Sequence, residues 1–227
     1  MKFAAHLDTM LQDVSLDERL ETYASLGFEA YELWCWWDYD LDALRAKADS
    51  FELVPSAICT KFISLVDARK RDDYLAGLAE TIEACKTLDC KIIISQVGDE
   101  LAKLDRDTQK ESLVAGLKRA AELLAETDLI LSIEPLNLLV DHAGYFLVHS
   151  DEANEIVEEV NSPNVKMLFD VYHQQISEGN MIPNIRSYAH SISHYHLADH
   201  PGRVGLEYWP SENRDKEILK TVLETYG

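Results

Sequence analysis

Four residues with side chains suited to metal binding or proton transfer stand at or near the ends of four short apolar runs in the second half of the chain. They are Glu134, Asp170, His196 and Glu207. Carboxylates and imidazoles bind divalent cations, and they also carry protons in general acid–base chemistry. Such a set has chemical meaning only if the secondary structure brings the four side chains to one place.

Short apolar runs alternate with helical patterns along the whole chain. The first helix is expected to begin at Ser15, whose spacing to Glu18 is that of a capping box, and to end at Gly27. The predicted strands are 2–8, 28–35, 51–60, 90–97, 129–135, 165–172, 194–199 and 204–209, and the further helices are 41–50, 72–88, 108–126, 151–160, 182–193 and 216–226. Eight strands alternating with helices predict a single α/β domain over 1–227, a (β/α)8 TIM barrel. An open doubly wound sheet is less favoured, because no glycine-rich loop follows the first strand.

The junction before the last strand departs from this pattern. Only the four residues 200–203 separate Asp199 from Val204, whereas parallel neighbours usually need a crossover of a dozen or more residues. The sequence therefore predicts that the crossover loop and helix between strands seven and eight are missing, or that the barrel closes abnormally there. The total of 227 residues, short for such a barrel, agrees with this expectation.

Side chains alternate between the two faces of a strand, which predicts where the four polar residues point. In strands five to eight, one set faces the helices and the other faces the barrel axis. The inward set includes Glu134, Asp170, His196 and Glu207, near the carboxyl ends where this fold places its chemistry. Three carboxylates in a confined site cannot all stay ionised without a positive partner. A divalent cation (Mn²⁺, Mg²⁺ or Co²⁺) would satisfy them. Taken singly, each acid could instead cap a helix or pair with an arginine.

Several further polar residues are weaker candidates. His173 is expected on a loop over the site, either bonding a substrate oxygen or packing the loop. Arg203 would hold a substrate carboxylate or hydroxyl oxygen, or pair with a surface acid. The remaining candidates are His6 as a rim or core histidine, Trp34, Trp36 and Trp37 as an apolar wall, and Lys61 as a substrate contact.

The charge balance excludes several classes of partner. With 21 Lys and Arg against 41 Asp and Glu, the formal net charge is −20. This argues against nucleic acids, which need a positive surface, and against anionic membranes. No apolar run is long enough to span a membrane, and the start does not look like a signal peptide. The four cysteines show no paired metal spacing, so buried free thiols in a reducing cytoplasm are expected.

Several segments together carry a family resemblance. They are 133–137 (IEPLN), 144–147 (GYFL), 169–175 (FDVYHQQ), 194–199 (HYHLAD) and 205–208 (GLEY). In these segments the chain resembles the hydroxypyruvate isomerase family of the xylose isomerase-like barrel superfamily.

The resemblance implies roles for six residues. It implies a metal held by the residues matching Glu134, Asp170, His196 and Glu207, with substrate contacts from His173 and Arg203. In the related ketose 3-epimerases the two glutamates also exchange the proton. Two departures stand out: many hydroxypyruvate isomerases carry Gln where His196 stands, and family members have a loop and helix between the positions matching Arg203 and Val204.

The leading hypothesis is a metal-dependent isomerase of small hydroxy-carbonyl compounds, in which Glu134 and Glu207 transfer a proton through an enediolate. A ketose 3-epimerase would use the same glutamates. An endonuclease IV-like nuclease is disfavoured by the charge. A non-catalytic barrel that binds a sugar or metal is the fourth reading. The expected partner is a small molecule, and self-association into a homo-oligomer stays open.

Overall fold

The fold is an eight-stranded parallel barrel. The computed structural model describes residues 2–196 and 203–206. Strands pair in chain order, and β8 pairs with β1 to close the ring. The strands are β1 Lys2–His6, β2 Ala30–Leu33, β3 Val54–Cys59, β4 Ile92–Ser95, β5 Ile130–Ile133, β6 Val165–Asp170, β7 Ile192–His196 and β8 Arg203–Leu206. The predicted barrel is therefore confirmed.

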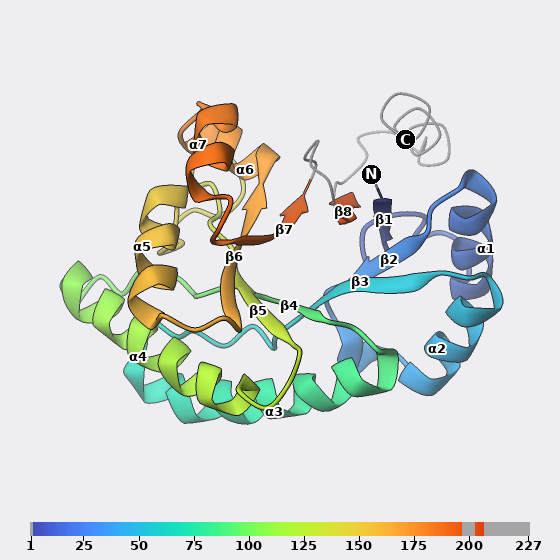
Figure 1. Ribbon diagram of the computed structural model, residues 1–227, viewed down its shortest axis with the longest axis horizontal. Coiled ribbons are helices and arrows are strands. Elements are labelled where there is room, and N and C mark those ends of the chain that lie inside the picture. The colour runs from blue at the N-terminus through green and yellow to red at the C-terminus, as the bar shows by residue number, and fades with distance from the viewer. Residues whose placement is uncertain (1, 197–202, 207–227) are drawn as a thin grey trace.

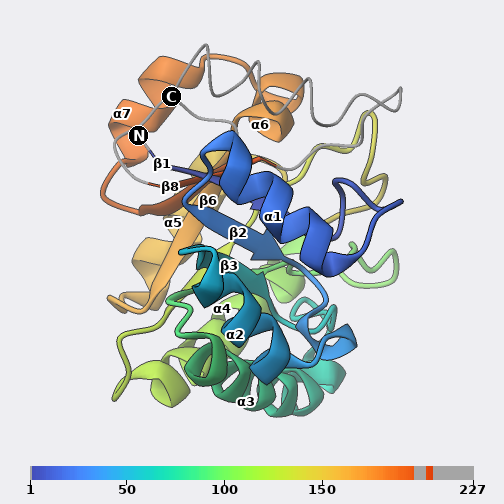
Figure 2. The same cartoon turned by 90° about the vertical axis from the view of Figure 1, so that its right-hand side faces the viewer.

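Helices cover the outside of the strands, as Figures 1 and 2 show for α1 to α5. The helices are α1 Leu16–Leu26, α2 Leu41–Ser50, α3 Arg71–Leu88, α4 Arg106–Leu124, α5 Ser150–Val160, α6 Val171–Ser177 and α7 Met181–Tyr188, with short 3-10 turns η1 Trp36–Asp38 and η2 Ala68–Lys70. Among the described residues, no helix is long and apolar enough to cross a membrane.

The two faces of the strands pack into separate apolar clusters. Leu131, Met167 and Tyr195 belong to the large core between strands and helices. Leu168 instead packs with Ala57, Cys59 and Ile94 in a small separate cluster. The separation matches the predicted alternation of outward and inward side chains. It leaves the inward positions at the strand ends for polar groups.

The first helix shows why the local signals were informative. The side chain of Ser15 accepts a hydrogen bond from the backbone N–H of Glu18 at 3.2 Å, as its capping role requires. Gly27 ends the helix with φ of 96°, in the left-handed region that favours glycine. Both predicted ends of this helix are confirmed.

Two predictions after Asp170 need correction. The strand predicted over 165–172 ends at Asp170, and helix α6 begins at the next residue. The apolar pattern continues past the strand, but the Asp170 side chain caps the new helix and so stops the extended conformation. The helix predicted over 182–193 ends at Tyr188. The closing helix predicted over 216–226 lies outside the described residues.

Strands β7 and β8 are parallel neighbours joined by only six residues, 197–202. A helical crossover of ordinary length does not fit in so few residues, which agrees with the prediction that the crossover loop and helix are missing. The register pairs Tyr195 with Val204 and His196 with Gly205.

Candidate functional site

A cavity of about 1100 Å³ opens at the carboxyl ends of the strands. Glu134 after β5, Asp170 at the end of β6 and His173 in α6 contribute polar groups to its lining. Trp34 and Phe62 contribute apolar surface. The cavity therefore lies where the fold places its chemistry.

Three of the four predicted metal ligands meet in the structure. The Nδ1 atom of His196 lies 3.3 Å from an oxygen of Glu134 and 3.3 Å from an oxygen of Asp170. All three side chains are buried. The fourth, Glu207, lies outside the described residues. Arg203 begins β8, but its side chain is likewise outside the description.

Asp170 uses its two carboxylate oxygens for different purposes. Its Oδ1 atom accepts hydrogen bonds from the backbone N–H groups of Tyr172 at 2.7 Å and His173 at 3.1 Å, and so caps α6. Its Oδ2 atom faces His196. His173 consequently lies in the first turn of a helix and is buried. The expectation that His173 sits on a loop was wrong, because the cap starts the helix immediately.

The hydrogen bonds of His173 define which of its nitrogens carries the proton. The backbone N–H and the side-chain amide of Asn137 both point at Nδ1, at 3.3 and 2.8 Å. Nδ1 is therefore the acceptor, and in the neutral ring Nε2 bears the hydrogen. That Nε2 lies 3.9 Å from Asp170 Oδ2. His173 thus presents a donor, rather than a lone pair, beside Asp170.

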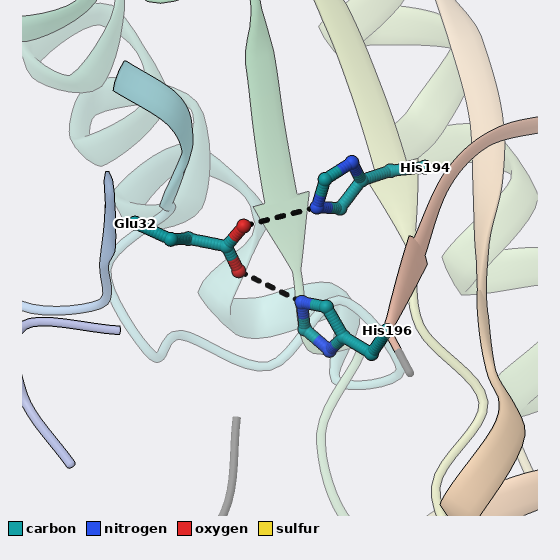
Figure 3. Close-up of side chains that lie close together, drawn as sticks. All are labelled: Glu32, His194 and His196. Carbon is teal, nitrogen blue, oxygen red and sulfur yellow. Dashed lines mark hydrogen bonds and ion pairs between the residues drawn. The ribbon is translucent and has the colours of Figure 1, made fainter. Parts of the chain in front are cut away.

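A buried glutamate lies behind His196. Glu32 on β2 points across the barrel interior at two histidines of β7, as Figure 3 shows. Its oxygens lie 3.0 Å from Nε2 of His194 and 2.7 Å from Nε2 of His196. The alternation of side chains predicted His196 to face inward, whereas Glu32 was not among the predicted site residues. Tyr31 and Leu33 on either side of it pack in the outer core, so alternation along the strand places Glu32 on the inward face. This alternation was the signal in the sequence that could have identified Glu32.

The charges in this cluster depend on one another. Burial lowers the pKa of His196, but Glu32, Asp170 and Glu134 outweigh it and hold that pKa well above its ordinary value. Burial raises the pKa of Glu32, but His196 and His194 pull it below the usual range. Burial likewise raises the pKa of Asp170, and His196 brings it down overall. Glu32 and Asp170 therefore stay ionised beside a positively charged His196.

Glu134 is anchored through its backbone. Its N–H donates to the Ser95 carbonyl at 3.2 Å, and its carbonyl accepts from the Tyr145 hydroxyl at 3.0 Å. The same Tyr145 oxygen accepts from the Val97 N–H at 2.7 Å. Burial raises the pKa of Tyr145, so the phenol stays protonated. The bonds tie Glu134 to β4.

The weaker candidates take different places. Trp34 lines the cavity, whereas Trp36 is buried and donates to the Cys59 carbonyl. Trp37 packs edge-on against Trp36. Lys61 forms a surface ion pair with Glu80 at 2.6 Å.

His6 is fully buried, with its ring 4.6 Å from that of Trp34. The backbone N–H of Asp8 donates to its Nδ1 atom at 3.2 Å. His6 does not line the cavity, which agrees with the core histidine of the two readings.

Comparison with known proteins places the chain in a family. Residues 20–218 match the family described as the xylose isomerase-like TIM barrel. The chain belongs to this family. Hydroxypyruvate isomerase of Escherichia coli (strain K12) is 28% identical over 212 residues, which cover 89% of this chain and 81% of the relative. The predicted family resemblance is therefore confirmed.

Two further proteins similar to this chain carry different names. The 2-oxo-tetronate isomerase of Cupriavidus necator is 28% identical over 239 aligned positions, covering 100% of this chain and 88% of the relative. The crystal structure of an AP endonuclease, family 2, from Brucella melitensis superposes with a TM-score of 0.81 at 27% identity, covering 100% of this chain and 89% of that chain. The names of these relatives span isomerases and a nuclease.

Proposed function

We propose that this isomerase of the xylose isomerase-like family interconverts small hydroxy-carbonyl compounds of the hydroxypyruvate or 2-oxo-tetronate type, with the help of a divalent cation. The observation that carries the proposal is the meeting of Glu134, Asp170 and His196 beside the cavity. The names of the relatives support the substrate class.

The donor set fits a divalent cation. Because Nε2 of His196 faces Glu32, Nδ1 is the ring nitrogen directed at Glu134 and Asp170, and a cation bound there would take the place of its proton. Two carboxylates and one imidazole nitrogen suit Mn²⁺, Mg²⁺ or Co²⁺. Glu207 is the fourth proposed ligand. When bound, such a cation polarises the carbonyl and hydroxyl oxygens of a substrate and makes the neighbouring C–H acidic.

Glu134 is the proposed general base. Its carboxylate lines the cavity while its backbone is fixed to Ser95 and Tyr145, so it can take a proton from a substrate carbon without moving the barrel. Removal of the proton leaves an enediolate. Glu207 is proposed to return a proton from the opposite side: to the neighbouring carbon in an isomerisation, or to the same carbon in an epimerisation.

His173 is the proposed donor to the substrate. Its Nε2–H lies beside the cavity and its ring is fixed by Asn137. A fixed N–H next to a developing oxyanion stabilises it without reorganisation. Arg203 is the second proposed substrate contact.

A substrate screen tests the proposal. Purified protein with Mg²⁺ or Mn²⁺ is incubated with hydroxypyruvate, 2-oxo-tetronate, small ketoses and ketose phosphates, and products are identified by NMR. We expect interconversion of a short hydroxy-carbonyl acid that EDTA abolishes. Turnover that survives EDTA unchanged contradicts the metal dependence, and a metal-loaded protein inert on all these compounds contradicts the function.

A further inference from the structure

Glu32, His194 and His196 form a cluster behind the proposed metal site that is shielded from solvent. Glu32, His194 and His196 are each at most 3% exposed, and the residues come from strands that are not neighbours in the barrel. Figure 3 shows the glutamate reaching from β2 toward both rings on β7. An ionised carboxylate buried this deeply is costly unless both oxygens accept hydrogen bonds. Each oxygen here faces one histidine Nε2.

We infer that Glu32 is a positioning residue that fixes His196 in the tautomer able to bind the cation. The inference rests on the proposed function, because it needs a metal at Glu134, Asp170 and His196. With Nε2–H donated to Glu32 at 2.7 Å, Nδ1 is the nitrogen that gives up its proton and offers a lone pair when the cation binds. Nδ1 is the atom that faces the two carboxylates. A carboxylate behind a ligating histidine sets the ring's tautomer and orientation and raises its basicity.

His194 holds the second carboxylate oxygen of Glu32. Its Nε2 donates to the second Glu32 oxygen at 3.0 Å, so the carboxylate is held at both ends. The β6–β7 register shifts between the Met167 and Leu168 pairs, which places an extra β7 residue before His194. Bulges of this kind re-aim side chains and are common beside active sites. The shift leaves both His194 and His196 facing inward toward Glu32.

The same three residues could in principle hold a second metal ion. Their ligand atoms lie within 4.8 Å of one another. The contacts favour the positioning role, because both Glu32 oxygens are already at hydrogen-bond distance from a ring N–H. Stoichiometry separates the two roles: positioning predicts one tightly bound ion per chain, and a second site predicts two.

The experiment compares Glu32→Gln with wild type and with the control Glu178→Gln. Glu178 is a partly buried carboxylate that accepts a hydrogen bond from Ser150 Oγ and lies outside the site. Glutamine cannot accept from two N–H groups at opposite ends, so one ring must change its tautomer or lose its partner. We expect Mn²⁺ affinity, measured by titration with EPR detection of free Mn²⁺, to fall about 10–100-fold in Glu32→Gln. In Glu178→Gln it should stay within about threefold of wild type.

A second measurement on the wild type does not depend on the variant folding. Long-range ¹H–¹⁵N NMR of the Mg²⁺-loaded protein, with the His196 signals assigned from His196→Gln, should show Nε2 protonated and Nδ1 unprotonated. Equal Mn²⁺ affinity in Glu32→Gln, a His196 ring protonated at Nδ1, or two bound ions per chain would each overturn the positioning role while leaving the proposed metal site in place. A wild type that binds no Mn²⁺ overturns both.

Discussion

Glu134 and His196, 62 residues apart in the sequence, meet at the mouth of the barrel with 3.3 Å between Oε1 and Nδ1. Asp170 lies at the same distance from that nitrogen. Two strand-end carboxylates therefore share one imidazole, and the imidazole is backed by a third carboxylate, Glu32. This arrangement links the fold to the proposed chemistry.

A substitution at Asp170 should weaken metal binding while leaving the cap of α6 in place. In Asp170→Asn the amide oxygen can still accept from the Tyr172 and His173 N–H groups, so the contribution of the cap to stability should change by less than about 1 kcal/mol. The charge facing His196 is lost. Mn²⁺ affinity should then drop by more than about 100-fold, which exceeds the loss expected for a residue that only orients a metal ligand. Urea unfolding and Mn²⁺ titration measure the two effects.

Asp105→Asn is the matched control for this substitution. Asp105 caps α4 by accepting from the Thr108 N–H at 2.8 Å and lies at the exposed surface. It should leave Mn²⁺ affinity unchanged. Unchanged Mn²⁺ binding in Asp170→Asn as well would mean that Asp170 is only a cap.

His173 should act on the substrate and not on the metal. Because its Nε2 bears the hydrogen, His173→Gln should lower kcat about 100-fold, as loss of one donor to an oxyanion does. Mn²⁺ affinity should change by less than about threefold. The exposed His149 provides the control, and His149→Gln should change neither quantity. Loss of metal binding in His173→Gln would instead make His173 a ligand.

The buried His6 should make the fold sensitive to acid. Burial lowers its pKa to about 4 from 6.5. As the pH falls below 6.5 the unfolded chain takes up a proton that the folded protein does not, so stability falls until about pH 4. Between pH 7 and pH 5 this group should cost about 2 kcal/mol of unfolding free energy. Urea unfolding of wild type and His6→Asn at both pH values measures the difference.

The control for His6 is the exposed His190, and His190→Gln should retain the wild-type pH dependence. His6→Asn will be less stable at every pH because it loses the packing on Trp34. The informative quantity is the change between pH 7 and pH 5. An unaltered pH dependence in His6→Asn would show that His6 is protonated in the folded state.

The sequence predicted the barrel well because local signals were strong. The cap at Ser15, the left-handed turn at Gly27 and the alternation that turned Asp170 inward are all set by neighbouring residues. Long-range pairing was harder. Glu32 was recognisable as a polar residue in a buried strand, but its partners are 162 and 164 residues away. Only closure of the barrel brings these strands together.

The helix after Asp170 was missed for a different reason. The apolar run continues into Val171 and Tyr172, so periodicity alone extended the strand. Aspartate is a preferred N-cap, and capping was the alternative to metal binding for this residue, but the start of a helix at Val171 was not predicted from it. In the structure Asp170 caps α6 through Oδ1 and faces His196 through Oδ2.

The nuclease reading can be tested through charge. A relative by structure is named an AP endonuclease, but this chain carries a formal net charge of −20. A protein that binds DNA through its phosphates needs a positively charged surface. We expect no binding to an abasic duplex at about 150 mM salt by fluorescence anisotropy. Micromolar binding with Mg²⁺-dependent cleavage of the duplex would instead support the hypothesis that the protein is a nuclease.

Proton transfer to and from carbon is the central claim, and solvent isotope exchange tests it most directly. The Mg²⁺-loaded wild type is incubated in D₂O with the substrate that the screen identifies, and deuterium at the reacting carbon is followed by ¹H NMR. We predict incorporation by the wild type and its loss in both Glu134→Gln and Glu207→Gln. Exchange that persists in both variants would contradict the two-glutamate mechanism.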